Sequence, residues 1–388
     1  MSAGRFISSR LRFEGKLATV AIAVSFIVII VSLAVSAGYR ESIRDGVSAL
    51  TGDIQLTRPD MNWYSPESPV HADPPCRTSV ESIPGVKGIV PVIYRGGIVK
   101  KDDDIRGVLF KGVPSADSAA LRVVVPESLA ISLDLKEGDE MLTYFVGERL
   151  QARKFTVAGT YPTLVTSADN LIVMASLEDM RRLNGWDEGE VSALEIMLED
   201  GSRDVASQRR IAMRAASVAT GMCGLDDRNP TLALPSADRY SQLFDWLSLI
   251  DFNVKIILAL MILVAGFNMI SALLILLFRN IPTIGTLKSL GMRDRGVSGV
   301  FLRLAARTVL KGMLAGNLLA AAFCLLQRGT HFLKLDPSNY FVNYVPVKLE
   351  LVSVLCVDAI AFAAIMLLML LPSLFISRVD PADTMRVR

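Results

Sequence analysis

Two long stretches without a charged side chain constrain this chain more than any other feature of its sequence. Leu17–Ala37 has 21 residues and Ile256–Phe278 has 23, and both are largely apolar. At 1.5 Å per residue, a helix of either length crosses a bilayer core of about 30 Å. Two further uncharged stretches, Gly312–Gln327 and Ala359–Ser377, have 16 and 19 residues. The sequence therefore predicts an α-helical integral membrane protein with four transmembrane helices, of which the third is the weakest.

The first stretch has an alternative interpretation as a secretory signal peptide. Val35, Ser36 and Ala37 resemble the small-residue site at which such peptides are cleaved. An apolar core of this length, however, exceeds the roughly 7 to 15 residues that are usual for a signal peptide. We therefore expect a retained membrane anchor.

Basic residues beside the ends of these stretches predict the orientation of the chain. They lie before the first stretch, between the second and the third, and after the fourth, and the positive-inside rule assigns such segments to the cytoplasm. Both termini are then cytoplasmic, and a region of about 210 residues between the first two spans lies outside. The basic residues are Arg5, Arg10, Arg12, Lys16, Arg279, Lys288, Arg293, Arg295, Arg303, Arg378, Arg386 and Arg388.

These arguments divide the chain into nine segments. Glycine- and proline-bounded β-rich runs alternate with helical patterns in the outside region, which predicts an α+β domain, and amphipathic patterns at both of its ends predict stalk helices. The segments are 1–16 cytoplasmic and interfacial, 17–38 transmembrane, 39–252 outside with the stalks, 253–278 transmembrane, 279–303 cytoplasmic, 304–327 transmembrane, 328–350 a short outside loop, 351–377 transmembrane and 378–388 a cytoplasmic tail.

The sequence offers no catalytic constellation, so we expect a non-enzymatic chain. It contains no phosphate-binding loop, no nucleophile elbow and no zinc-protease motif, and it has only two histidines. We therefore expect no metal, no cofactor bound by this chain and no nucleic-acid partner. Cys76 and Cys223 lie in the outside region, where a disulfide between them is possible, but their spacing does not decide it.

Polar and small residues within the spans suggest helix contacts. Gly312, Gly316 and Ala320 recur at intervals of four, the spacing that lets two helices approach closely. Asp358 lies inside the fourth stretch, where we expect a polar partner at similar depth such as Asn317. A basic stripe at the start of the third span suits anionic headgroups or a soluble partner, and the sequence does not choose between them. Its residues are Arg303, Arg307 and Lys311.

A short helix is predicted where the chain leaves the second span. Pro282 favours its start, with Asn280 as a possible cap, and Gly291 is placed to end it in the left-handed conformation. Ile284, Leu287 and Leu290 are predicted to form one apolar face. So short a helix is unstable alone in water, so this face needs cover. Helix physics leaves the membrane and another protein as equal candidates.

The sequence around this helix resembles the FtsX/MacB-type ABC transporter permeases. The segments that carry the resemblance are "IGTLKSLGMRDRGVSGVFLR" after the second span and "LPSLFISRVDPADTMRVR" at the end of the chain. The resemblance is greatest to the lipoprotein-releasing, or Lol-type, permeases. It rests there on "RFISSRLRF", "GDIQLTR" and "RKFTVAGTYPT" together with "EDMRRLNGWDEGEVSALEI".

The resemblance implies a role and a set of partners. The short helix would be the coupling helix that docks on a cytoplasmic ABC ATPase dimer, which would carry the ATP and Mg²⁺. ATP-driven motion would reach a periplasmic domain, with the chain in the bacterial inner membrane beside a second permease copy or paralogue. A lipoprotein would be the substrate, with a periplasmic chaperone and membrane lipids as further partners. The implied coupling residues are Ile284, Gly285, Leu287, Lys288, Leu290, Gly291 and Met292.

Alternative functions share this architecture. They are a MacB-like efflux permease for peptides, toxins or drugs, an FtsX-like regulator of a cell-wall hydrolase, and a membrane-anchored sensor without an ATPase. For lipoprotein release we expect an acyl-chain pocket between the first two spans. Its candidate residues are Val24, Ile27, Val28, Phe267 and Ile270.

Overall fold

The computed structural model divides the chain into two compact units. It describes residues 16–59, 68–101, 104–114, 121–146, 150–161, 171–223, 228–336, 340 and 342–373. The membrane unit comprises residues 1–40, 247–334 and 344–388, and the α+β unit comprises residues 41–246 and 335–343. The predicted segments 1–16 and 378–388 fall almost wholly outside the described residues.

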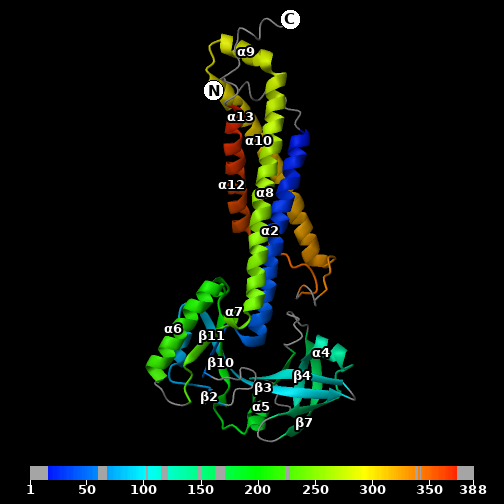
Figure 1. Cartoon of the computed structure of the whole chain (residues 1–388), viewed down its shortest axis with the longest axis vertical. Coiled ribbons are helices and arrows are strands. Elements are labelled where there is room, and N and C mark those ends of the chain that lie inside the picture. The colour runs from blue at the N-terminus through cyan, green and yellow to red at the C-terminus, as the bar shows by residue number, and fades with distance from the viewer. Residues whose placement is uncertain are drawn as a thin grey trace. The chain divides into compact units, whose positions relative to one another are not determined.

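Four long apolar helices form the membrane unit, as the uncharged stretches predict (Figure 1). Each is long and apolar enough to cross a membrane. The third helix begins ten residues before the predicted span at 304, because the amphipathic segment that precedes the span continues the same helix. The helices that lie wholly or mostly in this unit are α2 (Lys16–Thr51), α8 (Ser241–Arg279), α9 (Ile281–Ser289), α10 (Asp294–Thr330), α12 (Leu351–Leu368) and α13 (Leu370–Ser373).

The first two of these helices continue well beyond the length of a membrane span. α2 has 36 residues and α8 has 39, and neither is interrupted. The part of α2 beyond the membrane unit buries Ile43 and Val47, and the start of α8 buries Leu243 and Phe244. The stalk helices predicted from the amphipathic patterns are therefore extensions of the spans themselves.

One apolar cluster holds the membrane helices together. It contains Phe26 of α2, Met269 of α8, Ile284 of α9, Phe301 of α10 and Ile365 of α12, all of them buried. The short helix α9 thus belongs to the same packed core as the four long helices.

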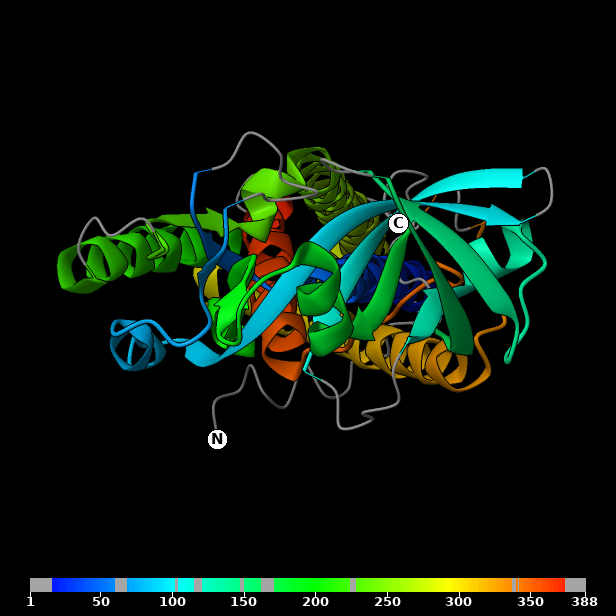
Figure 2. The ribbon, with the colours of Figure 1, turned by 90° about the horizontal axis from the view of Figure 1, so that it is seen from below.

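The α+β unit contains a strongly twisted sheet, which Figure 2 shows from below. Its strand order is β11-β1-β10-β3-β4-β8-β5-β7-β6, and a further pairing joins β3 to β6. A separate two-stranded sheet pairs β2 with β9. The strands are β1 (Ile54–Thr57), β2 (Val70–His71), β3 (Val86–Lys101), β4 (Asp104–Val113), β5 (Arg122–Pro126), β6 (Glu140–Phe145), β7 (Gln151–Tyr161), β8 (Ile172–Ser176), β9 (Glu190–Val191), β10 (Ala193–Leu198) and β11 (Leu232–Pro235).

The long strand β3 divides this sheet into two lobes. Through its pairing with β6 it closes β3, β4, β8, β5, β7 and β6 into a small barrel, while its first half pairs with β10 of the open part. Phe110, Phe145 and Phe155 fill the barrel, with ring centroids 5.1 to 6.1 Å apart. Gly97 makes room for them, since a Cβ there would lie 3.0 Å from the Phe145 ring. Small barrels of this kind are filled by side chains, so this lobe is a packed core.

Short helices cover the two lobes. α5 lies against β3, β4 and β8, and α6 packs on β1 and β11. α5 ends at Gly185, which is left-handed, and the Asp179 carboxylate in its first turn accepts a bond from the Leu121 N–H at 2.8 Å. The helices are α3 (Arg77–Glu81), α4 (Glu127–Ser132), α5 (Leu177–Asn184), α6 (Val205–Cys223) and α7 (Ser236–Arg239), with a 3₁₀ turn at Asp200–Ser202.

Candidate functional site

The short helix α9 turns sharply away from the end of α8. Asn280 connects the two helices, and its side-chain amide donates to the Leu276 carbonyl at 2.8 Å. Asn280 therefore occupies the cap position of α9, but its side chain closes the preceding helix instead of capping the new one. Pro282 lies in the first turn, where its missing N–H has no cost.

The end of α9 is the glycine stop that the sequence predicts. Gly291 has φ of +87°, and its N–H donates to the Lys288 carbonyl at 2.9 Å. This left-handed conformation is accessible to glycine at little cost. It lets the chain reverse at once into α10.

The prediction that Ile284, Leu287 and Leu290 form one apolar face is wrong for the two side chains that the structure describes. Ile284 is 1% exposed and packs into the membrane unit's own core, whereas Leu290 is 79% exposed. The reason is that Leu290 lies at the C-cap, two-thirds of a turn round from Ile284 at 100° per residue. The Leu287 side chain lies outside the described residues.

The remaining predicted coupling residues that the structure describes make contacts within the chain. Gly285 is buried, and Met292 packs against the same core as Ile284. Lys288 makes an ion pair of 2.9 Å with Asp294 in the first turn of α10, so it braces the reversal of the chain. Among the residues of this segment that the structure describes, Leu290 is the large apolar side chain that is exposed.

Exposed cations surround Leu290 in the sequence and continue along α10. Arg293 and Arg295 are exposed directly after the glycine stop. The predicted stripe is also exposed, and comprises Arg303, Arg307 and Lys311. An exposed leucine beside cations suits a partner with an apolar pocket and an acidic rim.

The small residues of α10 lie against α2 at very short range. A Cβ on Gly312 would lie 2.7 Å from the Ile22 side chain, and one on Gly316 would lie 2.6 Å from the Ala23 carbonyl oxygen. Ala320 is fully buried one turn further on. The predicted spacing thus corresponds to a close helix contact whose partner is α2.

Gly316→Ala is expected to loosen this contact. A methyl group there clashes with backbone, which cannot move aside as a side chain can, so the midpoint of thermal unfolding in detergent should fall by several degrees. Gly299→Ala on the same helix is the matched control, because a Cβ there meets nothing within 4 Å. An equal change for both variants would contradict the contact.

The acid inside the fourth span has the partner that its depth predicts. The Asn317 side-chain amide of α10 donates to an Asp358 carboxylate oxygen of α12. The pair joins two membrane helices by a polar contact, the usual arrangement for an ionisable residue within a span.

A buried polar cluster ties the far end of α2 to the sheet of the α+β unit. Lys111 of β4 donates to the Leu50 carbonyl of the last turn of α2 at 2.8 Å and to Glu195 of β10 at 2.8 Å. The Tyr94 hydroxyl donates to the same carboxylate. Gly52, with φ of +68°, ends the helix beside Glu195, where a Cβ would clash. A cation on the last carbonyls also complements the helix dipole.

The chain segment that leads into α8 joins the same cluster. The Arg239 guanidinium of α7 donates to Gln55 of β1 and lies 5.8 Å from the Tyr94 ring centroid. The Gln55 amide in turn donates to the Tyr94 hydroxyl at 2.9 Å. The last turn of α2 and the α7 residue Arg239, which precedes α8, are thus connected to the sheet through one hydrogen-bonded network.

Burial dominates the electrostatics of this network. It raises the pKa of Glu195 above its ordinary value, although Lys111 and the Tyr94 hydroxyl act in the opposite direction. Burial and the neighbouring Glu195 charge also raise the pKa of Tyr94. Removal of either member of the Lys111–Glu195 pair should therefore lower the stability of the fold strongly, since the member left alone would be a buried unpaired charge.

The two cysteines of the α+β unit lie next to each other. The Cys76 N–H contacts the Cys223 sulfur at 3.1 Å, and both residues are thiols here. Burial, followed by the contact with Cys223, raises the pKa of Cys76 to about 12. The structure thus brings together the two cysteines between which the sequence allowed, but did not decide, a disulfide.

We expect an added oxidant such as diamide to join Cys76 to Cys223 in the folded full-length chain. Mass spectrometry of peptides from unreduced protein should then detect this linked pair, because the Cys76 backbone N–H already contacts the Cys223 sulfur. Cys76→Ser is the control that should abolish the linked species. Full recovery of both thiols as alkylated peptides after oxidation would contradict the prediction.

The predicted acyl pocket is not enclosed within a single chain. Val24 is 51% exposed and Phe267 is 61% exposed, so neither lines an internal cavity. Ile27, Val28 and Ile270 are half-buried along the same two helices. A pocket from these residues would need a second surface opposite them, and the acyl site stays a prediction.

Comparison with known proteins identifies a domain in the C-terminal third of the chain. Residues 255–381, which contain α9 and the helices on either side of it, match the FtsX-like permease C-terminal domain. This chain carries an FtsX-like permease domain. Such permeases generally carry no catalytic activity, and the family implies partnership with a cytoplasmic ATPase and further permease subunits.

Full-length relatives of this permease come from lipoprotein-releasing systems. It is 21% identical to the lipoprotein-releasing system transmembrane protein LolC of Xylella fastidiosa, over 94% of this chain and 92% of that protein. It is 23% identical to the LolC of Neisseria meningitidis serogroup B over the same shares, and 21% identical to the LolE of Haemophilus influenzae over 95% and 93%.

Among solved structures, the periplasmic region of MacB from Actinobacillus actinomycetemcomitans is 9% identical. The match covers 51% of this permease and 95% of the MacB chain, with a TM-score of 0.30. A likeness of this size adds nothing to the fold described above.

Sequence reasoning missed the buried polar cluster of the permease. Its signal was present, because Lys111 interrupts the apolar run "GVLFKGV" and Glu195 interrupts "ALEIM". A charge at the centre of a buried strand needs a partner. The pairing of these two positions, which are 84 residues apart, was not visible without the sheet order.

Proposed function

We propose that this permease extracts lipoproteins from the bacterial inner membrane for delivery to the outer membrane, driven by a separate ATPase. The observation that carries the proposal is the match along nearly the whole chain to lipoprotein-releasing transmembrane proteins, 94% of this chain and 92% of the LolC relative. The absence of a phosphate-binding loop from the sequence fits an ATPase on another chain.

In this proposal the α+β unit is periplasmic and both termini are cytoplasmic. The basic residues between α8 and α10 support that orientation through the positive-inside rule. The reversal at Gly291 then faces the cytoplasm, where Leu290 and the exposed arginines after it would meet the ATPase. ATP and Mg²⁺ belong to that partner.

The uninterrupted helices α2 and α8 support a mechanical role. A continuous helix transmits a displacement along its length; Lys111 bonds the Leu50 carbonyl in the last turn of α2, and α8 begins two residues after Arg239, which belongs to the same network. Movement imposed at α9 would reach the sheet of the α+β unit by this route. The work done there would be lipoprotein release to a periplasmic carrier.

The test is reconstitution of the copurified complex with an acylated lipoprotein in proteoliposomes. We expect a small separate ATPase and a second permease subunit to copurify with the tagged full-length chain, as identified by mass spectrometry. Addition of ATP should move the lipoprotein into the soluble fraction when an acceptor is present, while a non-hydrolysable analogue should not. Copurification of a periplasmic efflux adaptor or a cell-wall hydrolase, without ATP-dependent release, would overturn the proposal.

A further inference from the structure

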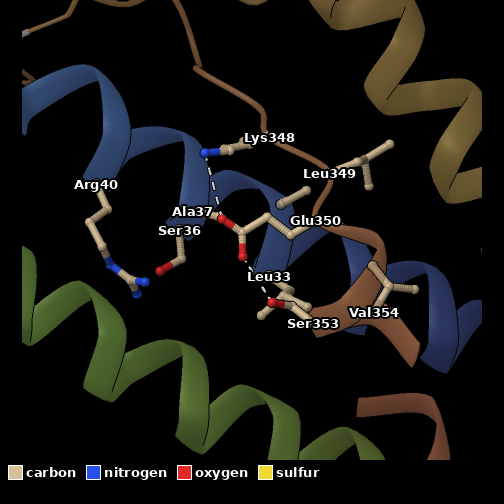
Figure 3. Close-up of a pocket in the computed structure, with 10 residues that line it drawn as sticks. Leu33, Ser36, Ala37, Arg40, Lys348, Leu349, Glu350, Ser353 and Val354 are labelled. Carbon is tan, nitrogen blue, oxygen red and sulfur yellow. Dashed lines mark hydrogen bonds and ion pairs between the residues drawn. The ribbon is translucent and has the colours of Figure 1, made fainter. Parts of the chain in front are cut away.

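A small cavity lies where the segment before α12 crosses α2 (Figure 3). Leu33 and Ala37 of α2 form one side, and Leu349 and Val354 form the other. Its empty volume is about 360 Å³ including the open mouth. All of its lining residues belong to the membrane unit, at the end of α2 that leads toward the α+β unit and at the start of α12.

The frame of this cavity is fixed by close backbone contacts. The Lys348 N–H donates to the Ala34 carbonyl of α2 at 2.9 Å, so the crossing segment is hydrogen-bonded to the backbone of that helix. Gly38 allows the approach, since a Cβ there would lie 2.4 Å from the Pro346 carbonyl oxygen. At the base of the loop, the buried Gln327 amide donates to the Val345 carbonyl at 3.0 Å. The crossing segment is therefore held in place rather than resting loosely on α2.

Two opposite charges stand at the cavity. The Lys348 ammonium and a Glu350 carboxylate oxygen are 3.7 Å apart, and the two side chains are 42% and 47% exposed. The other charged lining residue, Arg40, turns toward α8 together with Ser36, and both bond Asp251 (Figure 3). Lys348 and Glu350 are thus the charged lining residues that do not bond Asp251, and their long, exposed contact contributes little by itself. Glu350 also accepts a hydrogen bond from the Ser353 hydroxyl at 2.9 Å.

Exposed apolar side chains lie in the first turns of α12, next to the residues that line the cavity. Leu351, Val352 and Leu355 are all strongly exposed in the first turns of this helix. The charged pair therefore stands at the polar end of a membrane-spanning helix with an apolar surface below it. That order matches a lipid, with a headgroup at the interface and acyl chains along the helix.

We propose that this cavity binds the headgroup of a glycerophospholipid that carries both a phosphate and a primary amine. The phosphate replaces Glu350 as the partner of the Lys348 ammonium, and the lipid amine bonds the Glu350 carboxylate. Leu349 and Val354 cover the glycerol region. The site does not depend on which cargo the permease moves, so it stands or falls separately from lipoprotein release.

The charge pattern selects this headgroup over simpler ones. An anionic lipid without an amine brings its phosphate next to Glu350 and leaves that carboxylate facing a like charge. A free cation meets Lys348 in the same unfavourable way. A zwitterion satisfies both groups, and it exchanges one weak ion pair for two charge-assisted hydrogen bonds.

Native mass spectrometry of the full-length permease in detergent tests the proposal. With added dioctanoyl phosphatidylethanolamine, we expect Lys348→Gln and Glu350→Gln each to lower the lipid-bound fraction by roughly fivefold, as for one exposed ion pair. With dioctanoyl phosphatidylglycerol, Lys348→Gln should weaken binding while Glu350→Gln should strengthen it. Lys334→Gln is the matched control, because Lys334 is exposed in the same loop but does not line the cavity.

The thermal midpoint in the same detergent supplies an independent readout. Phosphatidylethanolamine should raise it in the wild type and in Lys334→Gln, and less in the two cavity variants. Equal binding of phosphatidylethanolamine by wild type and both cavity variants would overturn the proposal. So would binding of phosphatidylglycerol as tight as that of phosphatidylethanolamine, or displacement of the lipid by millimolar inorganic phosphate, which would indicate a site for free anions.

Discussion

Leu290→Asp is expected to abolish copurification of the ATPase while the permease still inserts and folds. Leu290 is 79% exposed at the end of α9, so its replacement removes no contact within the chain. A carboxylate forced into an apolar pocket of the partner costs about 2 kcal/mol or more, which lowers the affinity by roughly 30-fold. The measurement is the amount of ATPase retained on the tagged permease, relative to the permease itself.

Two further variants distinguish loss of the ATPase contact from loss of folding. Ile131→Asp is the matched control, since Ile131 is 82% exposed in the α+β unit and should retain the ATPase fully. Ile284→Asp should fail differently, because this side chain is buried in the membrane core and its loss should lower the yield of folded protein. Normal ATPase retention by Leu290→Asp would show that this residue does not contribute to the coupling contact.

Lys111→Met is expected to destabilise the α+β unit strongly. It leaves Glu195 buried without its cation and the Leu50 carbonyl without its donor. Breaking a buried pair in this way typically costs about 3 to 5 kcal/mol, which corresponds to a fall of about 10 °C in the thermal midpoint of a domain of this size. The measurement is thermal unfolding of the full-length permease in detergent, followed by tryptophan fluorescence.

The effect should depend on pH in a defined direction. Burial already raises the pKa of Glu195, and removal of Lys111 raises it further. An acid whose pKa is raised by folding binds more protons in the native state, so stability falls as pH rises through the range above its ordinary pKa. The deficit of Lys111→Met against wild type should therefore be smaller at pH 5 than at pH 7.5.

Two controls separate a buried pair from a surface one. Lys154→Met removes an ion pair with Glu140 of the same 2.8 Å length, but these side chains are 67% and 66% exposed, so the thermal midpoint should not change measurably. The double variant Lys111→Met with Glu195→Met should recover much of the loss, because no buried charge is left alone. Equal midpoints for Lys111→Met and wild type would rule out the pair as a structural element.

The helices and the family of this permease followed from local patterns. Uncharged runs as long as Leu17–Ala37 have few stable alternatives to a spanning helix, because unpaired backbone groups are too costly in lipid. The glycine stop at Gly291 was equally local, since a left-handed residue after a short apolar helix needs little more than its neighbours. The depth of Asp358 within its span was enough to point to Asn317.

The faces of the short helix and the joints of the α+β unit were decided by tertiary structure. Ile284 and Leu290 are both apolar, and packing of α9 against the other membrane helices is what buries one and exposes the other. The closure of the barrel, the meeting of Lys111 with Glu195 and the contact of Cys76 with Cys223 all join positions far apart in the chain. Such contacts depend on strand order and register, which hydrophobic period alone does not specify. The sequence by itself thus determined which segments form helices long and apolar enough to cross a membrane, while the fold decided which side chains they present.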